Sequence, residues 1–216
     1  MGRTQFAVFA SGRGSNFSAI YDQIQSGFID GDIVCVLSNN KDAQALEKAR
    51  QWGIETLHKN TSHYATVAEF SSVLIQSMHD RNVDYILLAG YMKKIPAEFL
   101  RAFPNKVVNI HPALLPAFGG KGFYGERVHQ AVIERGVKWS GVTVHFVDEI
   151  YDHGPIIFQW PVRVRDEVNA ESLAAHILEY EHKAYPKVVR WLSKNWIQIQ
   201  NNRTIFTGPE EEWNLE

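Results

Sequence analysis

The sequence has little cysteine and no long hydrophobic run. Cys35 is the only cysteine in 216 residues, so no disulfide can form within the chain, and its apolar neighbours predict burial as a small apolar side chain. The longest apolar run, around Ile86 to Met92, is far too short to cross a bilayer, and the N-terminus has no signal-peptide hydrophobic region. These absences predict a cytoplasmic protein.

The chain also lacks a strong charge of either sign and several well-known motifs. Its formal net charge is -2 and its basic residues are dispersed, so neither nucleic acid nor a membrane surface is an expected partner. There is no His-Glu-x-x-His and no cysteine pair, so we predict no metal. A serine hydrolase is not expected, because no Gly-x-Ser-x-Gly elbow follows a strand.

The first half of the chain alternates apolar strands with amphipathic helices. Strands that are apolar throughout are typical of a parallel sheet covered by helices on both faces. We therefore predict an α/β fold, a doubly wound, Rossmann-like and mostly parallel sheet. The expected strands are 6–10, 33–37, 55–58, 85–88 and 107–111. One helix is expected to begin near residue 15, and three more are expected at 43–52, 67–78 and 97–102.

The second half has a different pattern, which predicts an antiparallel part. Val142, Val144 and Phe146 alternate with more polar residues, which predicts a strand with two differently solvated faces. We expect a further strand at 156–164, a helix from about 170 that Pro186 kinks or divides, a hairpin at 197–206 and a loosely held tail after Gly208. No linker is evident, so we predict a single domain over 1–216, with halves of about 1–105 and 106–207.

A glycine-rich turn between the first strand and the first helix predicts a phosphate site. It consists of Gly12, Arg13, Gly14, Ser15 and Asn16. Free backbone amides and the helix dipole bind anions at such a turn, and Ser15 and Asn16 are expected to cap the helix. No Gly-Lys-Ser/Thr follows and no third glycine completes a dinucleotide fingerprint, so a mononucleotide phosphate fits best. An ordinary turn with capping residues is the alternative.

Asn109 and His111 are the first candidates for catalysis. They lie two residues apart in the strand 107–111, so their side chains should point the same way, and Pro112 should end the strand. Ligands bind at the carboxyl ends of strands in open α/β sheets, where an imidazole moves protons and a carboxamide donates to an oxyanion. The alternative is a buried pair that satisfies backbone groups.

A charged histidine needs a carboxylate, and the loop 148–155 offers two. Asp152 is the first candidate and Asp148 the second. The alternative for Asp152 is an aspartate that only forms a turn. His145 is either a partner behind this pair or a half-exposed residue on the polar face of its strand.

Five segments, in order along the chain, are similar to those of phosphoribosylglycinamide formyltransferases. They are Gly12-Arg13-Gly14-Ser15-Asn16, Leu88-Ala89-Gly90-Tyr91-Met92, Asn109 to Pro116, Gly141 to Val147, and Asp152-His153-Gly154-Pro155. The resemblance extends to Pro186. It implies transfer of the formyl group of the co-substrate 10-formyltetrahydrofolate to the primary amine of glycinamide ribonucleotide, in purine biosynthesis.

The resemblance also implies roles for single residues. Asn109 and protonated His111 would hold the oxyanion of a tetrahedral intermediate, and Asp152 would keep His111 charged and relay the amine proton. The glycine-rich turn would hold the ribonucleotide phosphate and Glu181 its ribose or glycinamide end. The pterin would lie against Leu88, Ala89, Gly90, Met92, Ile95, Asp148 and Ile150.

The chain departs from the family pattern at two places. The loop 118–125 replaces the usual Pro-Gly-x-His, and residues 63–67 carry no Arg or Lys, so Lys59, Arg13 or backbone amides would have to meet the phosphate charge. Another formyltetrahydrofolate enzyme, such as a deformylase, and a non-catalytic nucleotide-binding module are the alternatives. The sequence leaves a monomer and a homodimer equally open.

Overall fold

The computed structural model describes residues 2–166 and 169–214 and divides into two compact units. The first unit is Met1–Asn109 and the second is Ile110–Glu216. The division falls inside one strand, β5, Val107–His111, close to the predicted boundary between the two halves.

The first unit is built on parallel strands. They lie in the order β3-β2-β1-β4-β5, with β1 at Thr4–Phe9, β2 at Gly31–Ser38, β3 at Glu55–His58 and β4 at Tyr85–Leu88. The order reverses between β1 and β4, and such a switch point is where open α/β sheets bind ligands. The loops after these two strands are therefore the place to look for a site in this unit.

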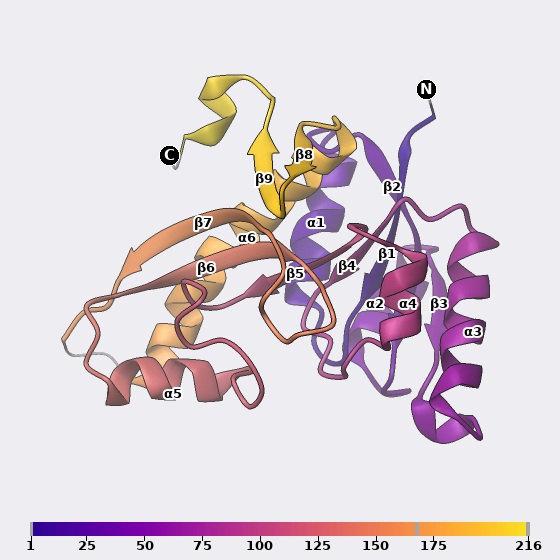
Figure 1. The fold of residues 1–216 in the computed structure, drawn as a ribbon, viewed down its shortest axis with the longest axis horizontal. Helices are drawn as coiled ribbons and strands as arrows, with labels where there is room; N and C mark the ends of the chain where they lie inside the picture. Colours follow the sequence, from indigo (N-terminus) through magenta and orange to yellow (C-terminus); the bar gives the residue numbers. More distant parts are fainter. Residues whose placement is uncertain (1, 167–168, 215–216) are drawn as a thin grey trace. The chain divides into compact units, whose positions relative to one another are not determined.

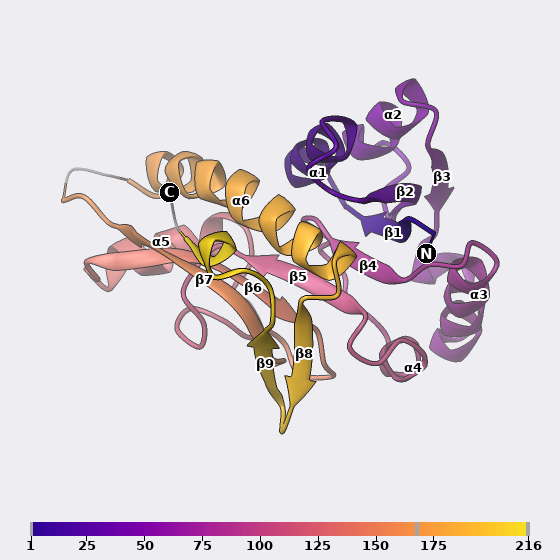
Figure 2. The same cartoon turned by 90° about the horizontal axis from the view of Figure 1, so that it is seen from above.

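Helices cover both faces of these strands, as Figure 2 shows. The helices α1, Ser15–Gln25, and α2, Gln44–Gln51, lie on one face, and α3, Val67–His79, and α4, Ala97–Ala102, lie on the other. A short 3-10 turn, η1, occupies Thr61–His63. Central strand residues such as Ala7, Val8 and Val36 are inaccessible to solvent, as expected for strands buried on both faces. Cys35 is also buried, and burial raises the pKa of its thiol to about 12.

The second unit is antiparallel, as predicted (Figure 1). Strand β6, Trp139–Phe146, pairs with β7, Ile156–Arg163, and a separate hairpin joins β8, Ile197–Gln200, to β9, Arg203–Phe206. Helix α5 spans Glu126–Glu134, and helix α6, Ala170–Ser193, packs on β6 and β7. The predicted fold class, mostly parallel α/β with an antiparallel C-terminal part, is confirmed.

Three local predictions for the second unit are wrong. Residues 140–146 of β6 are all buried, so this strand does not have one solvated face. Pro186 does not divide helix α6, because packing of its flanking residues Tyr185, Val188 and Val189, all fully buried, outweighs the lost hydrogen bond, while a kink at Pro186 stays a prediction. Within the tail after Gly208, residues 210–213 are not loose, since they form η2, Glu210–Trp213, which packs against α6.

Two contacts hold η2 in place. The Trp213 ring stacks on the Trp191 ring with centroids 5.1 Å apart and planes 11° apart. Arg190 in α6 forms an ion pair with Glu212 at 3.0 Å. Aromatic burial and a half-buried ion pair therefore order a segment that its acidic composition alone does not.

None of the helices in residues 2–166 and 169–214 combines the length and the hydropathy needed to span a bilayer.

The Trp191 stack predicts the stability of two tryptophan variants. Trp213→Ala should lower the free energy of unfolding by about 1–2 kcal/mol, because a half-exposed ring leaves an aromatic cluster. Trp139→Ala is the matched control, since Trp139 is 58% exposed, and should change stability by less than about 0.5 kcal/mol. Urea denaturation followed by circular dichroism measures both, and equal effects would contradict the packed tail.

Candidate active site

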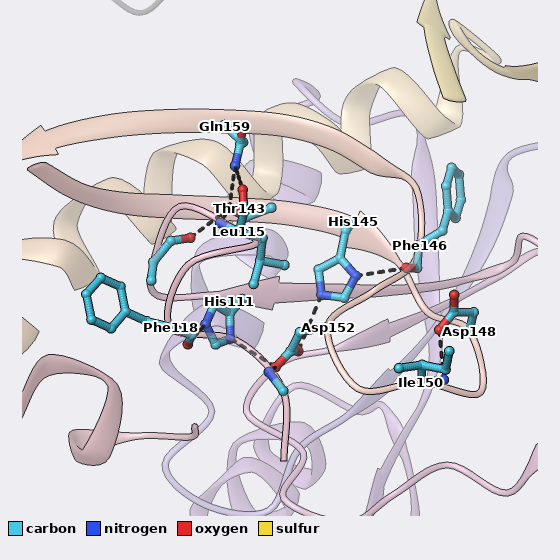
Figure 3. A network of polar contacts seen from close by, with 12 residues as sticks. His111, Leu115, Phe118, Thr143, His145, Phe146, Asp148, Ile150, Asp152 and Gln159 are labelled. Carbon is cyan, nitrogen blue, oxygen red and sulfur yellow. Dashed lines mark hydrogen bonds and ion pairs between the residues drawn. The ribbon is translucent and has the colours of Figure 1, made fainter. Parts of the chain in front are cut away.

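His111 is the central residue of the candidate site in the second unit. It ends β5, and only 3% of its surface is exposed. Its Nε2 lies 2.8 Å from the carbonyl oxygen of Phe118, and a carbonyl only accepts, so Nε2 carries a proton. Nδ1 is therefore the nitrogen at which His111 gains or loses its second proton. This nitrogen faces Asp152 Oδ2 at 3.7 Å (Figure 3).

Asp152 lies between two imidazoles. Its Oδ2 accepts a hydrogen bond from the Gly120 amide at 2.9 Å, and its Oδ1 lies 3.7 Å from His145 Nε2. His145 is 1% exposed, so the prediction of a half-exposed residue is wrong, and its Nδ1 donates to the Phe146 carbonyl at 2.8 Å. Figure 3 shows both rings turned toward the same carboxylate.

Burial decides the protonation of both histidines in the free protein. It lowers the pKa of His111 below the usual histidine range, and the opposing effects of Asp152 and the Phe118 carbonyl do not overcome it. Burial likewise lowers the pKa of His145, against the Phe146 carbonyl and Asp152. At neutral pH, His111 is therefore mainly neutral and carries its proton on Nε2.

Asp148 has a different partner. Its Oδ2 lies 2.7 Å from His153 Nδ1, and its Oδ1 accepts a hydrogen bond from the Ile150 amide at 2.9 Å. The first candidate, Asp152, is thus the carboxylate beside His111, and Asp148 holds the loop from which Asp152 projects.

A buried threonine fixes the segment that follows His111. The Thr143 hydroxyl donates to the Ala113 carbonyl at 2.7 Å and accepts from the Leu115 amide at 3.0 Å. Gln159 on β7 adds bonds to the Leu115 carbonyl and to the Thr143 hydroxyl. Thr143 and His145 share a face of β6 because they are two residues apart, a signal that could have grouped them from the sequence.

A cavity of about 260 Å³ opens beside Asp152. Its walls include Leu115, Gly119, Ile150, Tyr151 and Ile156. Ile150 is 60% exposed, an unusual place for so large an apolar side chain. An apolar wall beside the Asp152 carboxylate and His153 suits a ligand with a flat apolar part and polar edges.

The glycine-rich turn of the first unit differs in one detail from expectation. The residue before α1 is Gly14, at φ +66°, and no side chain caps the helix, so the expected capping by Ser15 and Asn16 is wrong. A Cβ on Gly14 would lie 2.7 Å from Ala45 Cβ, which explains the need for glycine. The turn exposes Gly12 and Arg13, while Asn16 is buried.

A lysine that sequence reasoning did not single out lies near this turn. Lys48 Nζ on α2 donates to Ser18 Oγ at 2.9 Å, and Ser18 Oγ donates to the Gly14 carbonyl at 3.0 Å. No acidic residue lies in the first turn of α1. Lys48 therefore adds positive charge beside α1, in a chain that has no Arg or Lys at 63–67.

The other predicted residues fall in one unit or the other. Asn109 is half-buried and pairs in register with Leu88, and the meeting of its carboxamide with His111 stays a prediction. In the first unit Leu88, Ala89 and Ile95 are buried, Met92 is 50% exposed and Gly90 is exposed. Glu181 is a buried acid on α6. Within residues 2–166 and 169–214, no three His, Cys, Asp or Glu are grouped to hold a metal ion.

Comparison with known proteins confirms the predicted resemblance. The formyl transferase family model matches residues 4–189. A chloroplastic phosphoribosylglycinamide formyltransferase of Arabidopsis thaliana is 46% identical over 188 residues, which are 87% of this chain and 64% of that protein. The phosphoribosylglycinamide formyltransferase of Haemophilus influenzae is 37% identical and covers 94% of each chain. This chain thus spans less than two thirds of the plant protein and nearly all of the bacterial one.

Solved structures agree. The crystal structure of glycinamide ribonucleotide transformylase 1 from Symbiobacterium toebii superposes with a TM-score of 0.89 at 37% identity and covers 95% of both chains.

His129 on α5 gives a prediction for acid stability. Burial is the main cause that lowers the pKa of His129 to about 4, and repulsion from His111 when that ring is protonated adds to it. Between pH 6.5 and 4 the unfolded chain therefore binds a proton that the native protein does not. The free energy of unfolding should therefore decrease as the pH is lowered from 6.5 to 4, and His129→Gln should make this decrease smaller. Urea midpoints at pH 7.5 and pH 5 measure it, and an equal fall in both proteins would contradict the buried, neutral His129.

Proposed function

Because the chain belongs to the formyl transferase family, we propose that it transfers the formyl group of 10-formyltetrahydrofolate to the primary amine of glycinamide ribonucleotide. The observation that carries the proposal is the buried His111, with Nδ1 facing Asp152, in a chain that matches this family over residues 4–189. The names of the plant and bacterial relatives support the choice of acceptor.

Three atoms of the substrates change their charge or protonation during the reaction. The amine nitrogen attacks the formyl carbon and must lose a proton, the formyl oxygen gains negative charge, and the departing nitrogen N10 of the folate takes up a proton when its bond to carbon breaks. Hydrogen-bond donors at the oxygen and one group that moves protons meet these needs. Asn109 and His111 are our donors, and Asp152 with His111 moves the proton.

His111 is neutral before the reaction and becomes charged during it. The oxyanion places a second negative charge beside the ring, which together with Asp152 favours a proton on Nδ1. The Nε2 proton of His111 is donated to the Phe118 carbonyl. A substrate oxygen could accept this proton only if it took the place of that carbonyl. Movement of Phe118 on binding would open that position.

Substrate binding is divided between the segments already named. We assign the ribonucleotide phosphate to Gly12, Arg13, Gly14, Ser15 and Asn16, its other end to Glu181, and the folate to Leu88, Ala89, Gly90, Met92, Ile95, Asp148 and Ile150. We place the enzyme in the cytoplasm, as a monomer or homodimer that needs neither metal nor nucleic acid.

Purified protein incubated with both substrates tests the proposal. Formylated glycinamide ribonucleotide should form, whereas other primary amines and water should give far less product. Release of formate with no dependence on the ribonucleotide would identify a deformylase. Nucleotide binding with no transfer would identify a non-catalytic module.

Two substitutions test the assigned chemistry. His111→Ala and Asp152→Asn should each lower kcat by about 100-fold or more while the ribonucleotide still binds, because their contacts strengthen in the transition state. Asp166→Asn, at an exposed carboxylate paired with Lys138, is the control and should retain wild-type kcat. Near-normal kcat in either active-site variant removes that residue from the mechanism.

Two further substitutions test the phosphate site. Ser15→Ala and Asn16→Ala should each raise KM for the ribonucleotide by about 5-fold or more, with KM for the folate unchanged, because each variant loses hydrogen bonds to the phosphate. Steady-state kinetics with either substrate varied separate the two constants. Unchanged KM for the ribonucleotide would leave the turn a purely structural feature.

A further inference from the structure

Ser11, the residue before the phosphate turn, joins three loops of the first unit. Its amide donates to the Gly90 carbonyl at 3.1 Å, and its hydroxyl oxygen accepts from the Met92 amide at 2.8 Å. The same hydroxyl donates to Asn39 Oδ1 at 2.5 Å. One side chain thus connects the loop after β1 with the loops after β2 and β4.

Because of its hydrogen bonds, the Ser11 hydroxyl has no proton left to donate to a phosphate. A serine hydroxyl has one proton to donate, and here that proton is on Asn39. A phosphate dianion needs donors, so the phosphate turn must supply its own. The Ser11 hydroxyl oxygen instead accepts a hydrogen bond from the Met92 amide and so holds the backbone at Met92. Without Ser11 this amide would need another acceptor.

Ser11 also lies where the order of the strands reverses. It follows β1, and residues 90–92 follow β4, the two strands on either side of the switch point. The loop 39–40 is anchored in turn, because Asn60 Nδ2 donates to the Asn39 carbonyl at 3.0 Å. The Ser11 hydroxyl is therefore linked through Asn39 to a fourth loop, the one that follows β3 and carries Asn60.

We propose that Ser11 is a positioning residue on which binding of both substrates depends. This inference rests on the proposed function, which assigns residues 12–16 to the ribonucleotide phosphate and residues 88–92 to the folate. The Ser11 hydroxyl sets the backbone of the second segment against the start of the first. Its loss should weaken both sites together, although Ser11 touches neither ligand through its proton.

Steady-state kinetics of Ser11→Ala test this role. Both KM values should rise about 5- to 10-fold, the effect of about one lost hydrogen bond, while kcat stays within about threefold of wild type. Ser11→Thr keeps the hydroxyl and should restore both constants. Ser26→Ala, which removes an exposed hydroxyl bonded to Gln23 at the far end of α1, is the matched control and should change neither.

Hydrogen exchange provides a readout that does not require activity. In the free protein, the segment 89–93 should exchange faster in Ser11→Ala than in wild type or in Ser11→Thr, because the Met92 amide has lost its acceptor.

The outcomes separate the two proposals. A rise in KM for the ribonucleotide alone would make Ser11 a phosphate ligand and overturn the inference, as would unchanged constants in an active Ser11→Ala enzyme. Absence of transfer by the wild-type protein would overturn the proposed function and this inference together. Faster exchange with both KM values raised, and recovery in Ser11→Thr, is the result that supports it.

Discussion

The half-buried carboxylate of Asp152 is the constraint on which the second unit is arranged. A partly desolvated charge needs partners, and the partners are one backbone amide and two imidazoles. Asp152 reaches them from a left-handed conformation, φ +53°, which aspartate tolerates better than most residues. Gly119 must lack a side chain, because a Cβ there would lie 2.4 Å from Leu115 and 3.2 Å from Asp152 Cβ. Gly119 and Gly120 thus both pack against or bind the Asp152 carboxylate.

The two units present different functional groups from different strand arrangements. The first unit uses a parallel sheet, whose strand ends and helix N-terminus present amides, and Gly14 and Ser11 shape those ends. The second unit uses an antiparallel pair, whose buried face places Thr143 and His145 behind the segment that carries His111. In the proposed function, anion binding is therefore assigned to the ends of parallel strands and proton transfer to residues beside an antiparallel pair.

Features that depend on hydrophobic periodicity and on turn residues could be predicted from the sequence. Apolar strands, amphipathic helices and the glycine-rich turn follow from local patterns, and the loop 148–155 offered Asp152 as a candidate partner of His111 without showing that the two meet. Packing between distant segments decided the rest. His145 is buried together with the rest of residues 140–146, Pro186 is tolerated because its neighbours are packed, and Trp213 is ordered by Trp191. The amide of Gly120 and the carbonyl of Phe118 act through the backbone, which residue type does not encode.

The coupling of His111 to Asp152 is the central claim, and titration of the His111 imidazole by NMR tests it most directly. In wild-type protein the pKa should lie below the usual histidine value, and Asp152→Asn should lower it further, because the variant loses a negative charge 3.7 Å from Nδ1. Asp148→Asn, which removes the charge paired with His153, should leave the pKa of His111 unchanged. An unchanged pKa in Asp152→Asn, or a fall in Asp148→Asn instead, would contradict the account.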